Sequence, residues 1–286
     1  MAADVTTSTP AKTSSEAVRG LPRGLPAFRW VVRMRRRALL GWGLAVGVVS
    51  AIYVSFYPTM GDAGELESLI EGMPDGLVSA LGYDTIGTAA GYLESTVYGL
   101  LAPILMLVFA LGFAARVLAG EEEDGSLELE TAAPISRVRS LSERYLALVV
   151  GIVWLGVVTG AVTLGLVPAL AMEVGTAELA ATTLGLTVFT TALASVTFAV
   201  GAATGRRVVA LATGAGLAVA GYIANALASL MDDGAWLERL SPFAWYLGNE
   251  PLRNGLSLGG MAALLGLTIV CLVAAVVTFD RRDLGV

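Results

Sequence analysis

The stretch EEEDGSLELETAAPISRVRSLSERY, residues 121–145, is the longest charged run of this chain that lies between two strongly apolar segments. The chain has 286 residues, of which 56% are hydrophobic and only 15% are charged, with a mean hydropathy of +0.74. Soluble proteins carry about a quarter charged residues. Uncharged apolar runs of about 18 residues or more are typical of transmembrane helices. Residues 121–145 are therefore predicted to be a polar loop of a membrane protein.

Working outward from this loop, the apolar runs predict an all-α membrane protein with six transmembrane helices. A tail rich in Ser, Thr, Ala and Pro (1–25) is expected to be disordered and has no signal-peptide pattern. A basic segment (26–37) suits an amphipathic helix on the membrane surface, although a charged flank of the first span explains its arginines equally well. Residues 38–286 form the membrane domain, with spans at about 38–57, 96–117, 146–170, 179–204, 208–231 and 257–279.

The distribution of positive charge predicts the orientation. Of the 18 lysine and arginine residues, all but Arg239 and Arg253 fall on the side that holds both termini and the loop 121–145. Because cytoplasmic loops carry the excess of positive charge, we expect both termini and this loop to lie in the cytoplasm. The protein itself is expected in the inner cell membrane. Two polar segments, 58–95 and 232–255, then lie outside, and short amphipathic helices are expected in the first of them.

Several classes of function conflict with the composition. The chain has no histidine and a single cysteine, Cys271, so catalytic His sites and Cys/His metal sites are not expected. The centres of the spans carry no charged residue, which disfavours a proton-coupled carrier. The only lysine, Lys12, lacks the glycines of a phosphate-binding loop. We therefore expect no ATPase site, no catalytic residue and no bound metal or cofactor, so that energy for any work must come from a partner.

Polar residues inside the spans are candidates for contact with a transported compound. The fourth span is rich in hydroxyl groups and the fifth contains an amide, which gives a candidate substrate-lining set of Thr187, Thr190, Thr191 and Asn225. The alternative is that these hydroxyls bond to their own backbone or to a neighbouring helix. The uncharged spans favour an amphipathic or lipophilic compound over a small ion.

Several short motifs stand out along the chain. The loop carries Gly120-Glu121-Glu122-Glu123, Gly125-Ser126-Leu127-Glu128-Leu129 and Ala133-Pro134-Ile135-Ser136-Arg137. Others are Phe56-Tyr57-Pro58, Gly91-Tyr92-Leu93, Leu240-Ser241-Pro242-Phe243 and Pro251-Leu252-Arg253-Asn254-Gly255. Together they resemble the type-2 permease family of ABC transporters, in particular permeases that export polyketide-type antibiotics. Glu130 and Thr131 depart from the pattern, because the family prefers apolar residues there.

The resemblance implies a six-helix exporter permease that works with two copies of a separate ATPase subunit, which binds ATP and Mg. A second permease half, identical or homologous, and membrane lipids would complete the contacts, with no role for nucleic acid. The implied ATPase-coupling residues are Glu121, Glu122, Glu123, Gly125, Leu127, Glu128, Pro134 and Arg137. The implied outer gate contains Pro242, Phe243 and Trp245, in short re-entrant helices. The alternative is a secondary carrier or an assembly scaffold that is not driven by ATP.

Overall fold

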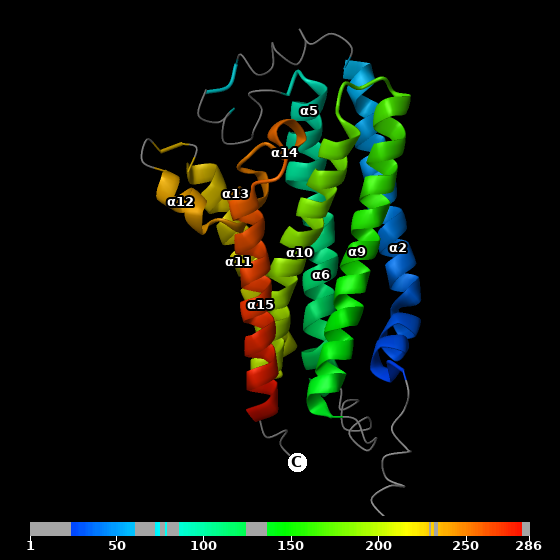
Figure 1. The fold of residues 1–286 in the computed structure, drawn as a ribbon, viewed down its shortest axis with the longest axis vertical. Helices are drawn as coiled ribbons and strands as arrows, with labels where there is room; N and C mark the ends of the chain where they lie inside the picture. Colours follow the sequence, from blue (N-terminus) through cyan, green and yellow to red (C-terminus); the bar gives the residue numbers. More distant parts are fainter. Residues whose placement is uncertain are drawn as a thin grey trace, which may run out of the picture.

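A computed structural model describes residues 24–60, 72–74, 78, 86–123, 136–228, 230–231 and 234–281. Within these residues the secondary structure is helical, and six helices are long and apolar enough to cross a membrane. They form one upright bundle (Figure 1). The prediction of an all-α protein with six spans is confirmed. Residues 1–23 of the expected tail, most of the loop 58–95 and the centre of the loop 121–145 lie outside the described residues.

The first span is α2 (Pro26–Phe56), followed by a short 3-10 turn, η1 (Tyr57–Met60). Thirty-one residues of α-helix extend about 46 Å, well beyond the ~30 Å hydrocarbon core of a membrane. The basic segment 26–37, expected as a separate surface helix, continues directly into the first span. The difference arises because Pro26 occupies the first turn, where proline is tolerated, and the helix continues without interruption through the arginines.

The second span is a rod from Ala89 to Glu123 that changes helix type along its length. It consists of α5 (Ala89–Tyr92), the π-helical η2 (Leu93–Leu101), α6 (Ala102–Ala115), the π-helical η3 (Arg116–Gly120) and α7 (Glu121–Glu123). The first π segment ends two residues before Pro103. Since proline lacks the amide of a regular helical bond, a local π adjustment lets the rod pass this residue without breaking.

The remaining spans are α9 (Arg137–Ala169), α10 (Thr176–Thr204), α11 (Arg207–Ala228) and α15 (Leu258–Arg281). Helix α10 is capped by Gly205, whose positive φ of 62° gives the left-handed conformation that turns the chain, so that only Gly205 and Arg206 separate α10 from α11. Between α11 and α15 lie α12 (Ala235–Leu240), α13 (Pro242–Leu247) and α14 (Pro251–Asn254). The residues of the implied outer gate, Pro242, Phe243 and Trp245, thus belong to a short helix, α13.

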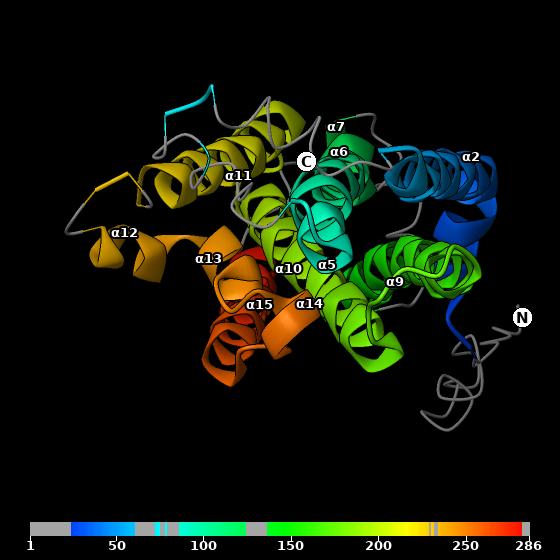
Figure 2. The same cartoon turned by 90° about the horizontal axis from the view of Figure 1, so that it is seen from above.

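Helix α10 lies at the centre of the bundle and packs against α6, α9, α11 and α15, while α2 packs mainly on α9. Seen from above, α11, α6 and α2 lie along one side and α15, α10 and α9 along the other (Figure 2). The contact between α9 and α10 is close, because a Cβ atom added to Gly156 would lie 2.2 Å from the Thr187 hydroxyl. Small residues allow such helix approach in membranes.

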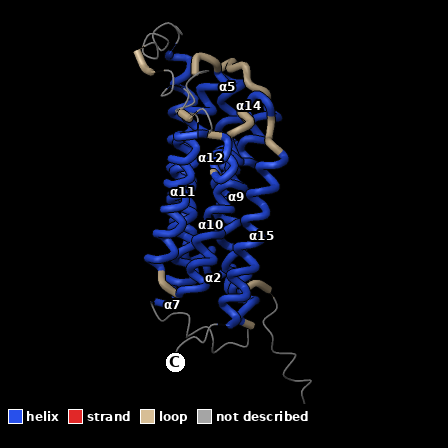
Figure 3. The backbone as a smooth tube through the Cα atoms, turned by 90° about the vertical axis from the view of Figure 1, so that its left-hand side faces the viewer, coloured by secondary structure: helices blue, strands red, loops and turns tan. Residues whose placement is uncertain are grey.

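The two ends of the bundle differ in composition. The start of α2, the start of α9, α7 and the end of α15 lie together at one end, which we call the arginine-rich end. Helices α5, α12 and α14 lie toward the opposite end (Figure 3). The first span begins and the last span ends at the arginine-rich end, as an even number of spans requires.

Candidate functional site

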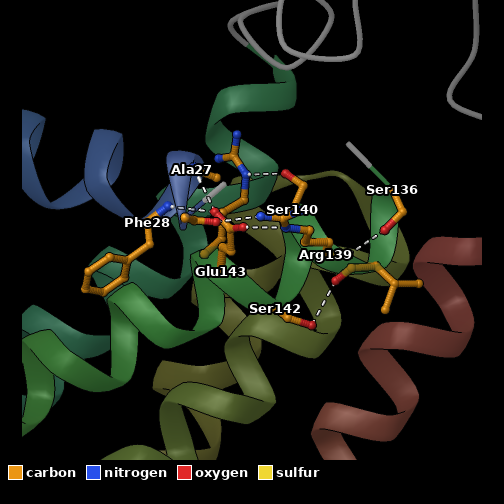
Figure 4. A network of polar contacts seen from close by, with 10 residues as sticks. Ala27, Phe28, Ser136, Arg139, Ser140, Ser142 and Glu143 are labelled. Atoms are coloured by element: carbon orange, nitrogen blue, oxygen red, sulfur yellow. Dashed lines mark hydrogen bonds and ion pairs between the residues drawn. The ribbon is translucent and has the colours of Figure 1, made fainter. Parts of the chain in front are cut away.

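A buried carboxylate at the arginine-rich end holds the start of α2. Glu143 of α9 is only 3% exposed and accepts hydrogen bonds from the backbone amides of Ala27 (2.8 Å) and Phe28 (3.3 Å). The first amides of a helix have no partner within the helix, and Leu25, which precedes α2, has no side chain that could cap them. Glu143 therefore caps α2 from another helix (Figure 4).

Arg139 extends this cap. Its Nε donates to Glu143 at 3.0 Å, and its Nη2 donates to the carbonyl of Gly24 at 2.5 Å. The backbone amide of Arg139 is bonded in turn to the hydroxyl of Ser136, which caps the start of α9. One polar network (Figure 4) thus joins the residue that precedes α9 to the beginning of α2.

A second buried charge pair joins the second and third spans. Arg144 is 1% exposed, forms an ion pair with Glu121, and donates to the carbonyl of Val117 at 2.7 Å. Its Nε also donates to Ser140 at 3.3 Å. A buried charge is tolerated only when it is paired and hydrogen-bonded, and this guanidinium meets both conditions.

A third contact joins the second span to the fifth. A carboxylate oxygen of Glu123 accepts the backbone amide of Arg207 at 2.9 Å, at the first residue of α11. A negative charge at this position also interacts favourably with the dipole of α11.

The predicted ATPase-coupling residues are thus divided between two environments. Glu121 and Glu123 bind other spans of the same chain, Glu122 is half-buried, and Arg137 is exposed in the first turn of α9. Gly125, Leu127, Glu128 and Pro134 lie outside the described residues. The described part therefore contains the two ends of the predicted coupling segment, and the first end is bonded to α9 and α11.

An apolar groove of about 510 Å³ lies between the second and fifth spans. Its α6 wall includes Ile104, Val108 and Gly112, spaced by four residues. Its other wall is formed by α11, and Phe243 of α13 also lines it. Ligand pockets typically measure about 300–1,000 Å³ and are mostly apolar, so the groove has the size and lining of a binding site for a small lipophilic body.

The predicted substrate-lining residues do not line this groove. Thr187, Thr190 and Thr191 donate their hydroxyls to the carbonyls four residues earlier in α10, at 2.7–2.8 Å. Asn225 follows the last groove residue of α11, Tyr222, by three positions. These bonds agree with the alternative interpretation, in which the hydroxyls bond to the backbone of their own helix. The groove is built instead from residues that carry no polar side-chain signal in the sequence.

The predicted outer-gate residues lie on or beside α13. Ser241 caps this helix through the amides of Phe243 and Ala244 and donates its hydroxyl to the carbonyl of Gly221 in α11 at 2.8 Å. The Phe243 ring packs edge-on against Phe189 at 4.7 Å, and Pro242 lies against Gly221. Trp245 donates its indole N–H to the carbonyl of Arg239 at 2.9 Å. Of the three, Phe243 contacts the groove.

A tyrosine network ties the same region to the centre of the bundle. The Tyr98 hydroxyl lies 2.9 Å from Thr163 of α9 and 2.8 Å from Thr183 of α10. Tyr246 of α13 donates to the carbonyl of Tyr98 at 3.2 Å. Burial raises the pKa of Tyr246 well above its usual value, so this hydroxyl remains a neutral donor.

The sequence did not reveal the residues that organise the arginine-rich end. Arg139, Glu143 and Arg144 fall inside a charged helix start, where solvent exposure is the usual expectation. The four-residue spacing of Arg139 and Glu143 suits an ion pair within one helix. Nothing in the sequence indicates that Glu143 also reaches residues 115 and 116 positions away.

A comparison with models of protein families shows to which family this chain belongs. A family model described as "ABC-2 family transporter protein" matches residues 31–284, which is nearly the whole membrane domain. The chain belongs to the ABC-2 family of transporter proteins. It is a multi-pass membrane permease of the ABC transporter type, a transport component rather than the ATPase itself. The resemblance of the sequence motifs to the type-2 permease family of ABC transporters is confirmed. A search of curated proteins found no match.

Proposed function

We propose that this ABC-2 permease exports an amphipathic or lipophilic compound, such as a drug, an antibiotic or a lipid, and that a separate ATPase subunit drives it. Two ATPase copies, carrying ATP and Mg, would act on two permease halves, identical or homologous. Binding and hydrolysis of ATP would alternate the access of a path between the halves. Family membership and the apolar groove support a permease for a lipophilic body.

The arginine-rich end is proposed to face the cytoplasm of an inner cell membrane. The support is the positive-inside rule, because all but two of the 18 basic residues fall on that side by the sequence count. In this orientation Glu123 and Ser136, which flank the predicted coupling segment, lie on the side of the compartment that contains ATP.

The observation that carries the proposal is the attachment of this segment at both ends. Before it, Glu121 pairs with Arg144 of α9 and Glu123 caps α11. After it, the network of Arg139 and Glu143 holds the start of α2. Buried charge-assisted bonds are short and strong. A displacement of the segment by an ATPase would therefore be delivered to the starts of three spans, α2, α9 and α11, at the same time.

Co-purification with the ATPase tests the partnership. The tagged permease, expressed with the ATPase gene product encoded beside it, is expected to retain that subunit and to support ATP-dependent efflux. Failure to associate would overturn the proposal. So would transport by the permease alone, in liposomes under an ion gradient, because this is the behaviour of a secondary carrier.

Charge reversal tests the coupling segment itself. Glu122→Arg and Glu128→Arg are expected to abolish ATP-dependent efflux while the protein remains monodisperse, because neither residue belongs to the ion pair of Glu121 and Arg144. The matched control is Glu238→Arg on α12, an exposed position toward the opposite end. Unchanged efflux in both coupling variants would show that the segment does not transmit the action of the ATPase.

A further inference from the structure

Two arginines continue the walls of the apolar groove toward the arginine-rich end. In the second span, the groove residues Val108 and Gly112 are four positions apart, and Arg116 comes four positions after Gly112. On α11, Arg207 comes four positions before the groove residue Leu211. Residues four apart share a face of a helix and are separated by about 6 Å along its axis. Each arginine therefore lies about one turn beyond the groove, on the wall that faces it.

The side chains of these arginines converge. A Cβ atom added to the buried Gly120 would lie 3.5 Å from Cδ of Arg207 and 3.6 Å from Cγ of Arg116. A third arginine, Arg35 of α2, places its guanidinium carbon 5.0 Å from the centre of the Phe113 ring. Arg116 and Arg207 thus meet just beyond one end of the groove, and Arg35 reaches from α2 to Phe113, three residues before Arg116.

In the described part of the chain, the nearby carboxylates bond to groups other than these guanidiniums. Glu121 forms its ion pair with Arg144, and Glu123 binds the backbone amide of Arg207 rather than its guanidinium. Glu122 is half-buried beside them and has a contact of its own. Among the described residues, none forms an ion pair with Arg35, Arg116 or Arg207. An anion placed among the three would relieve their mutual repulsion.

We propose that the transported compound is an amphipathic anion, whose apolar body occupies the groove between α6 and α11 and whose acidic group lies among Arg35, Arg116 and Arg207. This inference rests on the proposed function as a permease. Guanidinium groups bind carboxylate, sulfonate and phosphate oxygens through paired hydrogen bonds. The lining of the groove is almost entirely apolar, so the rest of the compound is expected to be apolar. The two parts of the site together select a molecule with one charged end.

A matched pair of fluorescent probes tests the charge requirement. The full chain in phosphatidylcholine nanodiscs is titrated with 1-anilinonaphthalene-8-sulfonate and with N-phenyl-1-naphthylamine, which has the same aromatic body without the sulfonate. The signal of empty nanodiscs is subtracted. We expect saturable binding of the sulfonate at least ten-fold tighter than that of the neutral amine. Equal affinities would overturn the proposal without any need for a variant.

Substitutions then locate the two parts of the site. Arg35→Gln, Arg116→Gln and Arg207→Gln are each expected to weaken sulfonate binding about five-fold, as for one unit charge removed at ~4 Å in water, and to leave the neutral amine unaffected. The matched control is Arg206→Gln, the exposed neighbour of Arg207. Ala215→Trp fills the groove and should weaken both probes, whereas Val273→Trp on the exposed face of α15 should weaken neither.

Two further results would also overturn the proposal. One is sulfonate binding that stays unchanged in all three arginine variants. The other is a site that holds a membrane lipid, in which case the variants would lose co-purifying phosphatidylglycerol while their affinity for the sulfonate is unchanged. Neither result affects the association with an ATPase or the ATP dependence of efflux. A failed charge requirement is therefore distinguishable from a failed permease assignment.

Discussion

Replacement of Glu143 is the sharpest test of the polar network at the arginine-rich end. Glu143→Ala removes the acceptor for the amides of Ala27 and Phe28 and leaves Arg139 without its 3.0 Å partner. Loss of a helix cap costs about 1 kcal/mol. A charge-assisted buried bond contributes about 1.5–3 kcal/mol, and a half-exposed ion pair about 0.5 kcal/mol. We expect a total destabilisation of about 3 kcal/mol. Glu143→Gln keeps one oxygen acceptor, so its expected cost is about 1 kcal/mol.

These free energies translate into measurable changes of thermal stability. For a chain of this size 1 kcal/mol corresponds to about 2–4 °C in Tm. In detergent, the loss of the monodisperse protein on heating should therefore shift down by about 9 °C for Glu143→Ala and about 3 °C for Glu143→Gln. The control, Glu238→Ala, removes an exposed glutamate of α12 and should shift Tm by less than about 1.5 °C.

Hydrogen exchange adds a readout that separates the cap from general destabilisation. In Glu143→Ala the amides of residues 27–30 should exchange faster than in the wild type, while those at the centre of α10 should keep their protection. Unchanged exchange at 27–30, together with a Tm equal to that of the Glu238→Ala control, would refute the assignment of Glu143 as the cap of α2.

Three further substitutions test other contacts of the bundle. Arg144→Ala should destabilise the protein by about 3–5 kcal/mol, because it removes the guanidinium that pairs with the buried carboxylate of Glu121. The double variant with Met at both positions should recover most of this loss on thermal denaturation. Tyr98→Phe removes bonds to α9 and α10 and should cost about 1 kcal/mol in the same assay; no change would mean that these bonds do not stabilise the bundle. Gly156→Leu should destabilise by at least ~1–3 kcal/mol, since its Cβ would meet a hydroxyl of α10, whereas the control Gly165→Leu enters open space; equal effects would contradict the close packing of α9 on α10.

The sequence predicted the six spans because their apolar cores carry no charge. It placed the starts of α2 and α9 about ten residues too late, since a hydropathy pattern ends at the first charges while the helix continues through them. The charged residues remain part of the helix because their side chains pair with other spans, as Arg144 does with Glu121. The two π segments were not predictable either, because a hydropathy pattern does not show which hydrogen-bonding register the backbone of an apolar helix adopts.

The candidate site was predicted less well than the fold. Threonine hydroxyls look like ligand contacts in a sequence, yet in a helix they bond readily to the carbonyl four residues earlier. The groove is visible only once α6 and α11 are placed side by side, since its walls are ordinary apolar residues. The role of Glu143 depends on contacts with residues 115 and 116 positions away, which no local pattern encodes.

The cap on α2 also has a consequence for biosynthesis. Ala27 and Phe28 belong to the first of the six spans, but Glu143 is translated 116 residues after Ala27. At about 5–20 residues per second the ribosome needs roughly 6–23 s to cover that distance. During this time the first span is already made while its two leading amides still lack their carboxylate. The earliest helix of the bundle is thus completed only when the third one arrives, so the assembly of the membrane domain has a built-in order.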